Sequence, residues 1–179
     1  MSAATTEEVL VLDFGGQYSQ LIARRIRECG VFAELLPAST SIESIEARDP
    51  KALVLSGGPA SVHDLGAPDF PERLTQLGIP VLGICYGMQV MAHALGGKVE
   101  GAEAGEFGRT ELTLTGDGGI LLGGLPDEQT CWMSHRDSVF EAPEGFTPIA
   151  STPGSPVAAL ESAGKKLYGI QFHPEVVHT

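Results

Sequence analysis

The sequence has little charge, and most of the charge it has is of one sign. Charged residues make up 19% of the 179 residues, and 23 acidic side chains against 11 lysines and arginines give a formal net charge of −12. A protein whose main partner is a phosphate backbone needs the opposite sign. We therefore expect no nucleic-acid partner.

Long apolar runs and a basic, apolar leader are also missing. A membrane-spanning helix needs about 20 consecutive apolar residues, and no segment of the chain comes close to that length. The first residues, Met1 to Glu8, lack both the positive charge and the apolar stretch of a signal peptide. The composition therefore predicts a cytoplasmic protein with no membrane partner.

Cysteine is scarce as well. Cys29, Cys85 and Cys131 are odd in number and widely separated, which is typical neither of a disulfide framework nor of a zinc site. The length fits one domain, since a domain averages roughly 150 residues, and such a domain buries about 70% of its unfolded surface without a cross-link. We expect a single domain over residues 1–179 in a reducing compartment, with no metal site.

The first half of the chain alternates short apolar runs with helical periodicity, which predicts repeated βα units and a parallel sheet. The run Val9–Leu12 is unbroken, as in a strand covered on both faces. Further strands are expected at 31–36, 52–55 and 79–84, and helices at 18–28, 41–48, 70–77 and 86–95.

The second half, from Lys98, changes to short alternating strands separated by glycine, proline and aspartate turns. One such strand, Arg109–Thr115, ends at a glycine-rich turn over 116–119. Later runs are found at 147–151, 157–161 and 167–172. We predict a single α/β domain with a mixed, mostly parallel central sheet flanked by helices and a second half rich in antiparallel strands.

Cys85 stands in the sequence Gly-Ile-Cys-Tyr-Gly, where a predicted strand turns into a helix. This is the form of a nucleophile elbow with cysteine in place of serine, since small residues two before and two after let strand and helix approach. The helix N-terminus favours thiolate, and the N–H of Tyr86 becomes free to hold an oxyanion. The alternative is a merely buried cysteine. Cys29 and Cys131 lack this context and are interpreted as core or incidental.

His173 and Glu175 follow another predicted strand. Residues two apart in extended chain project to the same side, so the imidazole and the carboxylate can meet. A thiol nucleophile needs a base, and that base needs a carboxylate to fix its tautomer. The position at a strand's carboxyl end, like that of Cys85, favours a site over an ordinary surface pair.

A glycine pair, Gly57 and Gly58, follows a third parallel-type strand and precedes a proline. Glycine lets the backbone approach a ligand and turn an N–H toward it, although a tight turn would use the same residues. The segment is not a phosphate-binding loop, because no Gly-Lys-Ser/Thr sequence follows it.

These motifs, in this order and at these separations, resemble the class I (triad) glutamine amidotransferases over nearly the whole chain. Three longer stretches, Asp13–Arg25, Trp132–His135 and Phe172–Val176, are similar to the amidotransferase domains of GMP synthases. The resemblance implies a flavodoxin-like fold and hydrolysis of glutamine to glutamate and ammonia through a thioester. It also implies that the ammonia serves the ATP-dependent amination of XMP to GMP.

The same resemblance implies the roles of individual residues. Cys85 attacks the amide carbon, His173 transfers the proton and Glu175 orients His173. The backbone N–H groups of Gly58 and Tyr86 form the oxyanion hole. The expected substrate contacts are Gly57, Gln89, Ser134, His135, Arg136 and Asp137.

Two features depart from GMP synthases. Position 136 is arginine where that family usually has glycine, so a close backbone approach there requires the side chain to point outward. The chain also stops at Thr179, where an ATP pyrophosphatase (synthetase) domain and a dimerisation domain are expected to follow. The resemblance implies that ATP and Mg²⁺ bind in the synthetase domain and that the amidotransferase domain, which is the present chain, holds no cofactor. It also implies that the full-length enzyme is a homodimer.

Three alternatives remain open: a cysteine hydrolase or peptidase on the same scaffold, an amidotransferase for another acceptor, and a catalytically silent regulatory module. Gln89 and the segment 57–59 favour glutamine over a peptide. The stretches Gly16–Tyr18 and Trp132–His135 argue against amidotransferases that feed anthranilate or carbamoyl phosphate synthesis. The silent module is favoured by Arg136 and by the early end of the chain.

Overall fold

The computed structural model describes residues 7–179, without the side chains of residues 102 and 103. Most of Met1–Glu8, the segment considered as a leader, lies outside the described residues. The strands are β1 Glu8–Asp13, β2 Phe32–Pro37, β3 Ala52–Leu55, β4 Val81–Ile84, β5 Lys98–Leu114, β6 Glu128–Glu141, β7 Thr147–Ser151, β8 Ala159–Ser162 and β9 Leu167–Ile170. The helices are α1 Ser19–Glu28, α2 Ile42–Glu46, α3 Tyr86–Ala94 and α4 Gly119–Leu122, with 3₁₀ turns η1 Glu72–Gln76 and η2 Ala163–Lys165.

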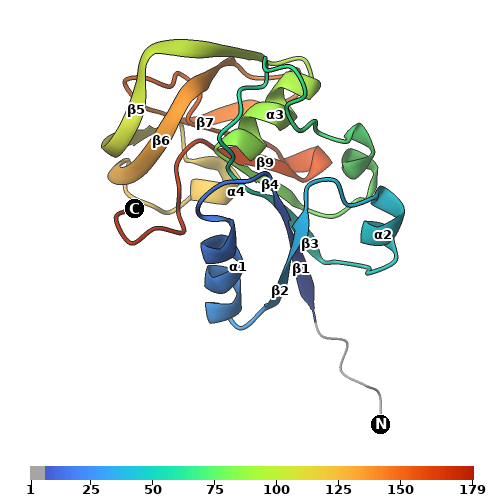
Figure 1. Ribbon diagram of the computed structural model, residues 1–179. Helices are drawn as coiled ribbons and strands as arrows, with labels where there is room; N and C mark the ends of the chain where they lie inside the picture. The colour runs from blue at the N-terminus through green and yellow to red at the C-terminus, as the bar shows by residue number, and fades with distance from the viewer. Residues whose placement is uncertain (1–6) are drawn as a thin grey trace.

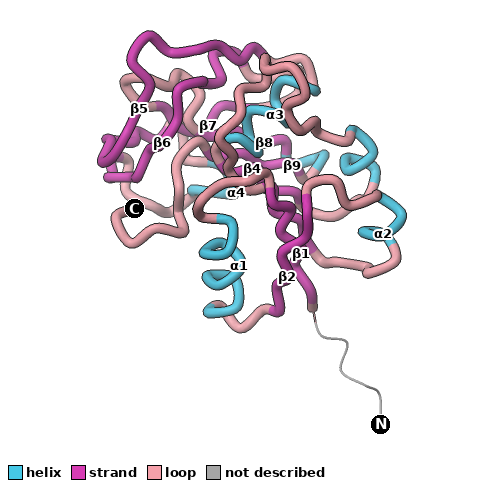
Figure 2. The backbone as a smooth tube through the Cα atoms, viewed as in Figure 1, coloured by secondary structure: helices cyan, strands magenta, loops and turns pink. Residues whose placement is uncertain are grey.

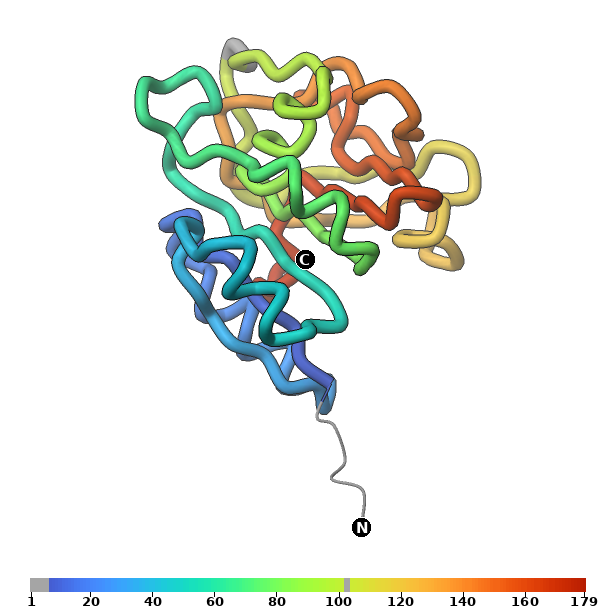
Figure 3. Tube along the Cα trace, turned by 90° about the vertical axis from the view of Figure 1, so that its right-hand side faces the viewer, coloured from blue at the N-terminus to red at the C-terminus, as the bar shows by residue number. Residues whose placement is uncertain are grey.

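The described strands form one mixed sheet in the order β2-β1-β3-β4-β9-β8-β7-β5-β6. The first five run parallel and the remainder pair antiparallel, as predicted. The parallel order matches the flavodoxin type of doubly wound sheet. Figure 2 shows the strands running as a continuous band through the molecule, and Figure 3 shows the blue N-terminal elements at the opposite end from the yellow-to-red antiparallel strands.

Side chains of the parallel strands alternate between two buried faces. Leu10 and Leu12 pack in one cluster with Ile45 of α2 and Met88 of α3, whereas Val11 packs in another cluster with Ile22 of α1. Figure 1 shows α1 and α2 on opposite sides of β1 and β3. Burial on both faces explains why these strands are unbroken apolar runs in the sequence.

The antiparallel half differs from the prediction of short strands. β5 and β6 form one long hairpin that pairs Lys98 with Glu141 and Thr113 with Glu128. The pairing shifts register between Gly101 and Glu106, and Gly105 has a positive φ of 62°. Glycines that suggested turns therefore form a bulge, which bends a strand without ending it.

Several predicted boundaries move by a few residues. The helix expected at 70–77 is the 3₁₀ turn η1, and the expected strands at 79–84 and 157–161 begin only at Val81 and Ala159. Proline at 80 lacks the N–H that a ladder position uses, which delays β4. The run 167–172 leaves the sheet after Ile170, so that its last residues enter the site described below. Among residues 7–179, no helix is both long and apolar enough to cross a membrane.

Candidate active site

Cys85 occupies a strained turn between β4 and α3. Its φ of 53° and ψ of −109° lie in a region that residues with a Cβ seldom adopt. A Cβ on Gly83 would lie 2.6 Å from the backbone of Gly87, and one on Gly87 would lie 2.4 Å from the carbonyl oxygen of Leu55. Both glycines are therefore needed for the close approach of strand and helix, as the elbow pattern predicts.

His173 and Glu175 follow β9, the strand beside β4, and both side chains are buried. The imidazole Nδ1 lies 2.7 Å from Glu175 Oε1. Arg25 of α1 donates from Nε to the backbone oxygen of Glu175 at 3.0 Å, which anchors the segment. The Tyr18 and His173 rings pack at a steep angle of 70°, with 5.2 Å between ring centroids. The imidazole is thus held by Glu175 on one side and by Tyr18 on another.

The environment of His173 favours the charged imidazole. Burial by itself lowers its pKa, but hydrogen bonding with Cys85 and with Glu175 outweighs burial and raises the pKa to about 10. A cationic His173 beside Cys85 favours the thiolate, which is the nucleophilic form of cysteine. Cys131 differs, because burial and the Glu106 charge raise its thiol pKa to about 11.

The glycine pair after β3 lies directly against the nucleophile. A Cβ on Gly57 would lie 3.1 Å from Cε1 of His173 and 3.5 Å from Cβ of Cys85, so only glycine leaves this space open. A Cβ on Gly58 would lie 2.5 Å from the carbonyl oxygen of Phe14. Within residues 7–179, the amide N–H groups of Gly58 and Tyr86 donate to no protein acceptor. Both donors are therefore available to a ligand.

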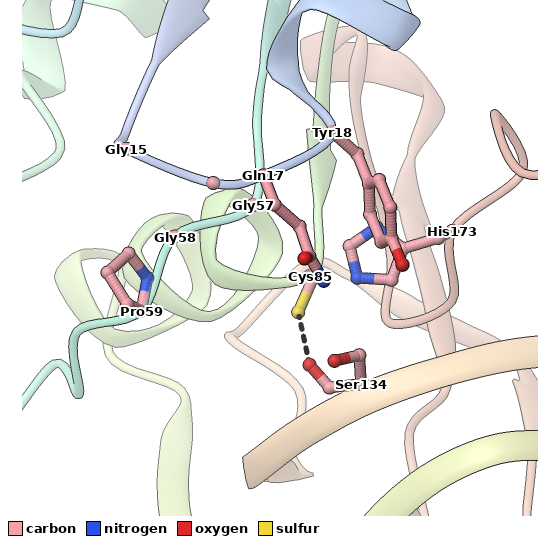
Figure 4. A pocket seen from close by; sticks show the side chains of 10 residues that line it. Gly15, Gln17, Tyr18, Gly57, Gly58, Pro59, Cys85, Ser134 and His173 are labelled. Atoms are coloured by element: carbon pink, nitrogen blue, oxygen red, sulfur yellow. Dashed lines mark hydrogen bonds between the residues drawn. The ribbon is translucent and has the colours of Figure 1, made fainter.

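Two cavities meet at Cys85. The first, about 330 Å³, is lined by the loop Gly15–Tyr18, the segment Gly57–Pro59, Cys85, Ser134 and His173; we call it the Tyr18 cavity. Figure 4 shows the Cys85 sulfur pointing into it near the His173 ring, with a dashed bond toward Ser134. The second, about 460 Å³, we call the Gln89 cavity. It is lined by the segment Gly58–Ser61, Asp64, Cys85, Gln89, Phe107 and the segment Ser134–Asp137.

The structure brings the expected substrate residues Gln89 and 134–137 together around the Gln89 cavity, whereas Gly57 lies on the Tyr18 side. The His135 side chain is directed away, because its Nε2 lies 3.0 Å from buried Glu106. Its backbone is thus the part that can face a ligand. Arg136 is exposed and is one of the residues that line this cavity.

Two buried polar residues near the site were not predicted from the sequence. Glu106 of β5 accepts hydrogen bonds from the backbone of Gly154 and from the Thr152 and Ser155 hydroxyls. Gln171 is fully buried and contacts Cys85. A buried amide at the end of an apolar run is the one signal that could have indicated Gln171. Glu106 has no local signal, since its partners lie 29 to 49 positions away.

Metal ligation is not supported by the described residues. Within residues 7–179, no three histidine, cysteine, aspartate or glutamate side chains gather as metal ligands do. The chemistry available at the site is instead a thiol, an imidazole and a carboxylate, with two free backbone donors nearby. This is the set that nucleophilic acyl transfer requires.

Comparisons with known proteins agree with this geometry. The family model described as "Glutamine amidotransferase class-I" matches residues 10–179. Curated relatives include the GMP synthase [glutamine-hydrolyzing] of Acetivibrio thermocellus, 56% identical over 97% of this chain and 34% of the relative. That of Mycobacterium marinum is 59% identical over 96% of this chain and 32% of the relative.

A solved structure, that of a putative GMP synthase subunit from Thermoplasma acidophilum, is also similar. Its TM-score is 0.79 at 34% identity, over 97% of this chain and 87% of that chain. This chain spans about a third of the length of the curated relatives named above. The match over residues 10–179 shows that the chain belongs to the class I glutamine amidotransferase family.

Proposed function

We propose that this chain hydrolyses the side-chain amide of glutamine to glutamate and ammonia. The observation that carries the proposal is the meeting of Cys85, His173 and Glu175 beside two unpaired backbone donors, in a chain of this family. The curated relatives are named as glutamine-hydrolysing enzymes, which supports the same substrate.

The first half-reaction forms a thioester. The Cys85 thiolate attacks the amide carbon, and the resulting oxyanion accepts hydrogen bonds from the Gly58 and Tyr86 N–H groups. One such donor contributes about 10²–10³ to the rate. His173, held by Glu175, gives its proton to the leaving nitrogen, and the C–N bond breaks to release ammonia.

The second half-reaction returns the enzyme to its starting state. His173, now neutral, takes a proton from water as the water attacks the thioester carbon. The C–S bond breaks, glutamate leaves, and Cys85 is again a thiolate beside a protonated imidazole. The Gln89 cavity holds the amino acid end of glutamine, through Gln89 and the backbone of residues 134–137.

In the whole enzyme the ammonia aminates XMP to GMP in an ATP-dependent reaction. The relatives extend well beyond this domain, which supports a synthetase domain as the partner. ATP and Mg²⁺ belong to that domain, the assembled enzyme is a homodimer, and the reaction takes place in the cytoplasm. An amidotransferase for another acceptor and a silent regulatory module are the competing functions.

The test is glutamate release from glutamine by this chain, first alone and then with a GMP synthase synthetase domain, ATP, Mg²⁺ and XMP. We expect low basal activity that the mixture stimulates. Cys85→Ala should abolish turnover and leave the circular dichroism spectrum unchanged, and retained turnover would reject Cys85 as nucleophile. Activity without stimulation would favour another acceptor, and no activity in either mixture would favour the silent module.

A further inference from the structure

The buried amide of Gln171 connects the nucleophile to Gln89. Gln171 Nε2 lies 3.6 Å from Cys85 Sγ, and Gln171 Oε1 lies 3.1 Å from Gln89 Nε2. Gln89 Nε2 in turn donates to the backbone oxygen of Asp137 at 2.6 Å. His135 Nδ1 lies 2.9 Å from the same oxygen. A chain of side-chain amides therefore runs from the sulfur to the strand that lines the Gln89 cavity.

The backbone carbonyl of Asp137 fixes the direction of this chain. A carbonyl oxygen only accepts, so the atom of Gln89 that faces it must be the nitrogen that bears hydrogens. That nitrogen also faces Gln171, whose oxygen must then be the atom turned toward Gln89. The nitrogen of Gln171 is left facing Cys85. The sulfur is thus presented with a donor and not with an acceptor.

Two polar neighbours of the sulfur therefore favour opposite protonation states. The backbone oxygen of Ser134, 3.7 Å from Sγ, accepts from a thiol and repels a thiolate. The N–H of Gln171 can donate to a thiolate, and a hydrogen bond to a charged form stabilises that form. Gln171 is fully buried, so its N–H makes this contact without competition from bulk water.

We propose that Gln171 is a catalytic residue of this site, which donates a hydrogen bond to the Cys85 sulfur, stabilises the thiolate, and is oriented for this role by Gln89 and the Asp137 carbonyl. Gln89 Nε2 is used internally, by Gln171 and by the Asp137 carbonyl, while Gln89 also lines the Gln89 cavity. Removing Gln171 should therefore reduce sulfur reactivity more than glutamine binding. The part of the proposal that concerns turnover rests on the proposed function, whereas thiolate reactivity does not.

Other charged and titratable groups around the sulfur are separable from Gln171. His173 faces it from the segment after β9, and Tyr18 lines the same cavity from the loop before α1. Across the Gln89 cavity lie Asp64, His135, Arg136 and Asp137, which line the wall without hydrogen bonding to the sulfur through their side chains. A Gln171 variant that keeps His173 in place isolates the contribution of the amide.

The experiment is the pH dependence of Cys85 alkylation by iodoacetamide, followed by site-resolved mass spectrometry. All proteins carry Cys29→Ser, because Cys29 is exposed and would also react. Gln171→Met keeps the length of the side chain and removes the donor. We expect its alkylation profile to move up by about one pH unit, which lowers the rate roughly tenfold at pH values below the wild-type midpoint. Gln171→Glu, which presents an acceptor to the sulfur, should move the profile further.

Two controls make the result decisive. Gln76→Met removes an exposed amide that lines neither cavity, and it should leave the profile unchanged. Gln89→Met removes the group that orients Gln171, so it should give a smaller shift in the same direction and a higher KM for glutamine. If Gln171→Met does not fold, Gln89→Met decides the question by the same measurement.

The outcomes also separate this proposal from the proposed function. An unchanged alkylation profile in a folded Gln171→Met protein, with a native melting temperature, would overturn the proposal. Glutamine kinetics should show a fall in kcat with little change in KM. A wild-type chain that alkylates readily near neutral pH but does not hydrolyse glutamine would reject the function and leave the role of Gln171 standing.

Discussion

Glu106 and His135 face each other across the β5–β6 hairpin, with 3.0 Å between Oε2 and Nε2 and only 8% and 1% of their side chains exposed. The His135 ring also faces the Asp137 oxygen, so both of its nitrogens lie opposite acceptors. This pair fastens the strand that lines the Gln89 cavity to the segment 152–155 behind it.

The first prediction concerns acid stability. Burial by itself raises the pKa of Glu106, but hydrogen bonds from His135, Thr152, Gly154 and Ser155 outweigh it and lower the pKa from 4.5 to about 2. A depressed carboxyl pKa contributes stability above pH 4.5 and loses it as the pH falls toward 2. Glu106→Gln should cost on the order of 3 kcal/mol at pH 7. In urea titrations at several pH values, the free energy of unfolding of this variant should also fall less steeply with acidification than that of wild type.

Glu111→Gln is the matched control, since Glu111 lies on the same strand and is exposed. The free energy of unfolding of this variant should depend on pH in the same way as that of wild type. Equal loss of stability in wild type and Glu106→Gln between pH 4.5 and 2 would show that the Glu106 carboxylate does not supply this contribution.

The second prediction concerns the space in front of the nucleophile. Gly57→Ala places a methyl group 3.1 Å from the His173 ring and 3.5 Å from Cβ of Cys85. We expect kcat for glutamine to fall about 100-fold, because small displacements of reacting groups have effects of that size. Gly164→Ala is the control, as its Cβ would meet no atom within 4 Å. Equal kcat values for the two variants would contradict the assigned position of Gly57.

The third prediction concerns backbone strain at Cys85. Its φ of 53° is unfavourable for any residue with a Cβ but acceptable for glycine. In urea titrations, the free energy of unfolding of Cys85→Gly should therefore exceed that of Cys85→Ala by about 1 kcal/mol. Glycine is ordinarily the less stabilising of the two residues. Both variants should be inactive. A more stable alanine variant would mean that the turn is not strained in solution.

The fourth prediction concerns the carboxylate of Glu175. Glu175→Gln keeps an oxygen for His173 Nδ1 but removes the charge that helps to raise the His173 pKa to about 10. The imidazole then loses its proton at lower pH. The alkaline limb of the kcat profile should therefore move down by roughly one to two pH units.

Glu175→Gln should also lower kcat by about 10²-fold, less than loss of Cys85 or His173, because Glu175 makes no bond to substrate. Glu128→Gln, an exposed change on β6, should leave the profile unaltered. If the alkaline limb of the kcat profile stays in place in Glu175→Gln, the charge of Glu175 does not raise the pKa of His173.

Local patterns predicted the parallel half of the fold and the elbow well. The strand ending at Leu55 is a continuous apolar run because both faces are covered, and Cys85 is flanked by glycines because strand and helix touch there. Each of these features depends on neighbours in sequence or on a repeated unit. The mixed sheet of a class I glutamine amidotransferase was accordingly confirmed.

The hairpin and the buried polar chain could not be predicted in the same way. Whether Gly105 begins a turn or a bulge depends on its pairing with β6, which the local sequence does not encode. Gln171 and Cys85 are 86 positions apart, and His135 and Glu106 are 29 apart. The catalytic roles assigned to Cys85, His173 and Glu175 remain predictions that the experiments above address.

The arrangement of two cavities around one sulfur has a consequence for inhibitor design. Under the proposed function, a glutamine analogue with an electrophile reaches Cys85 through the Gln89 cavity, whereas a group entering past Tyr18 reaches it through the Tyr18 cavity. The two cavities share Gly58, Pro59, Cys85 and Ser134 as walls. A compound that occupies both would therefore contact Cys85 from two adjoining spaces at once.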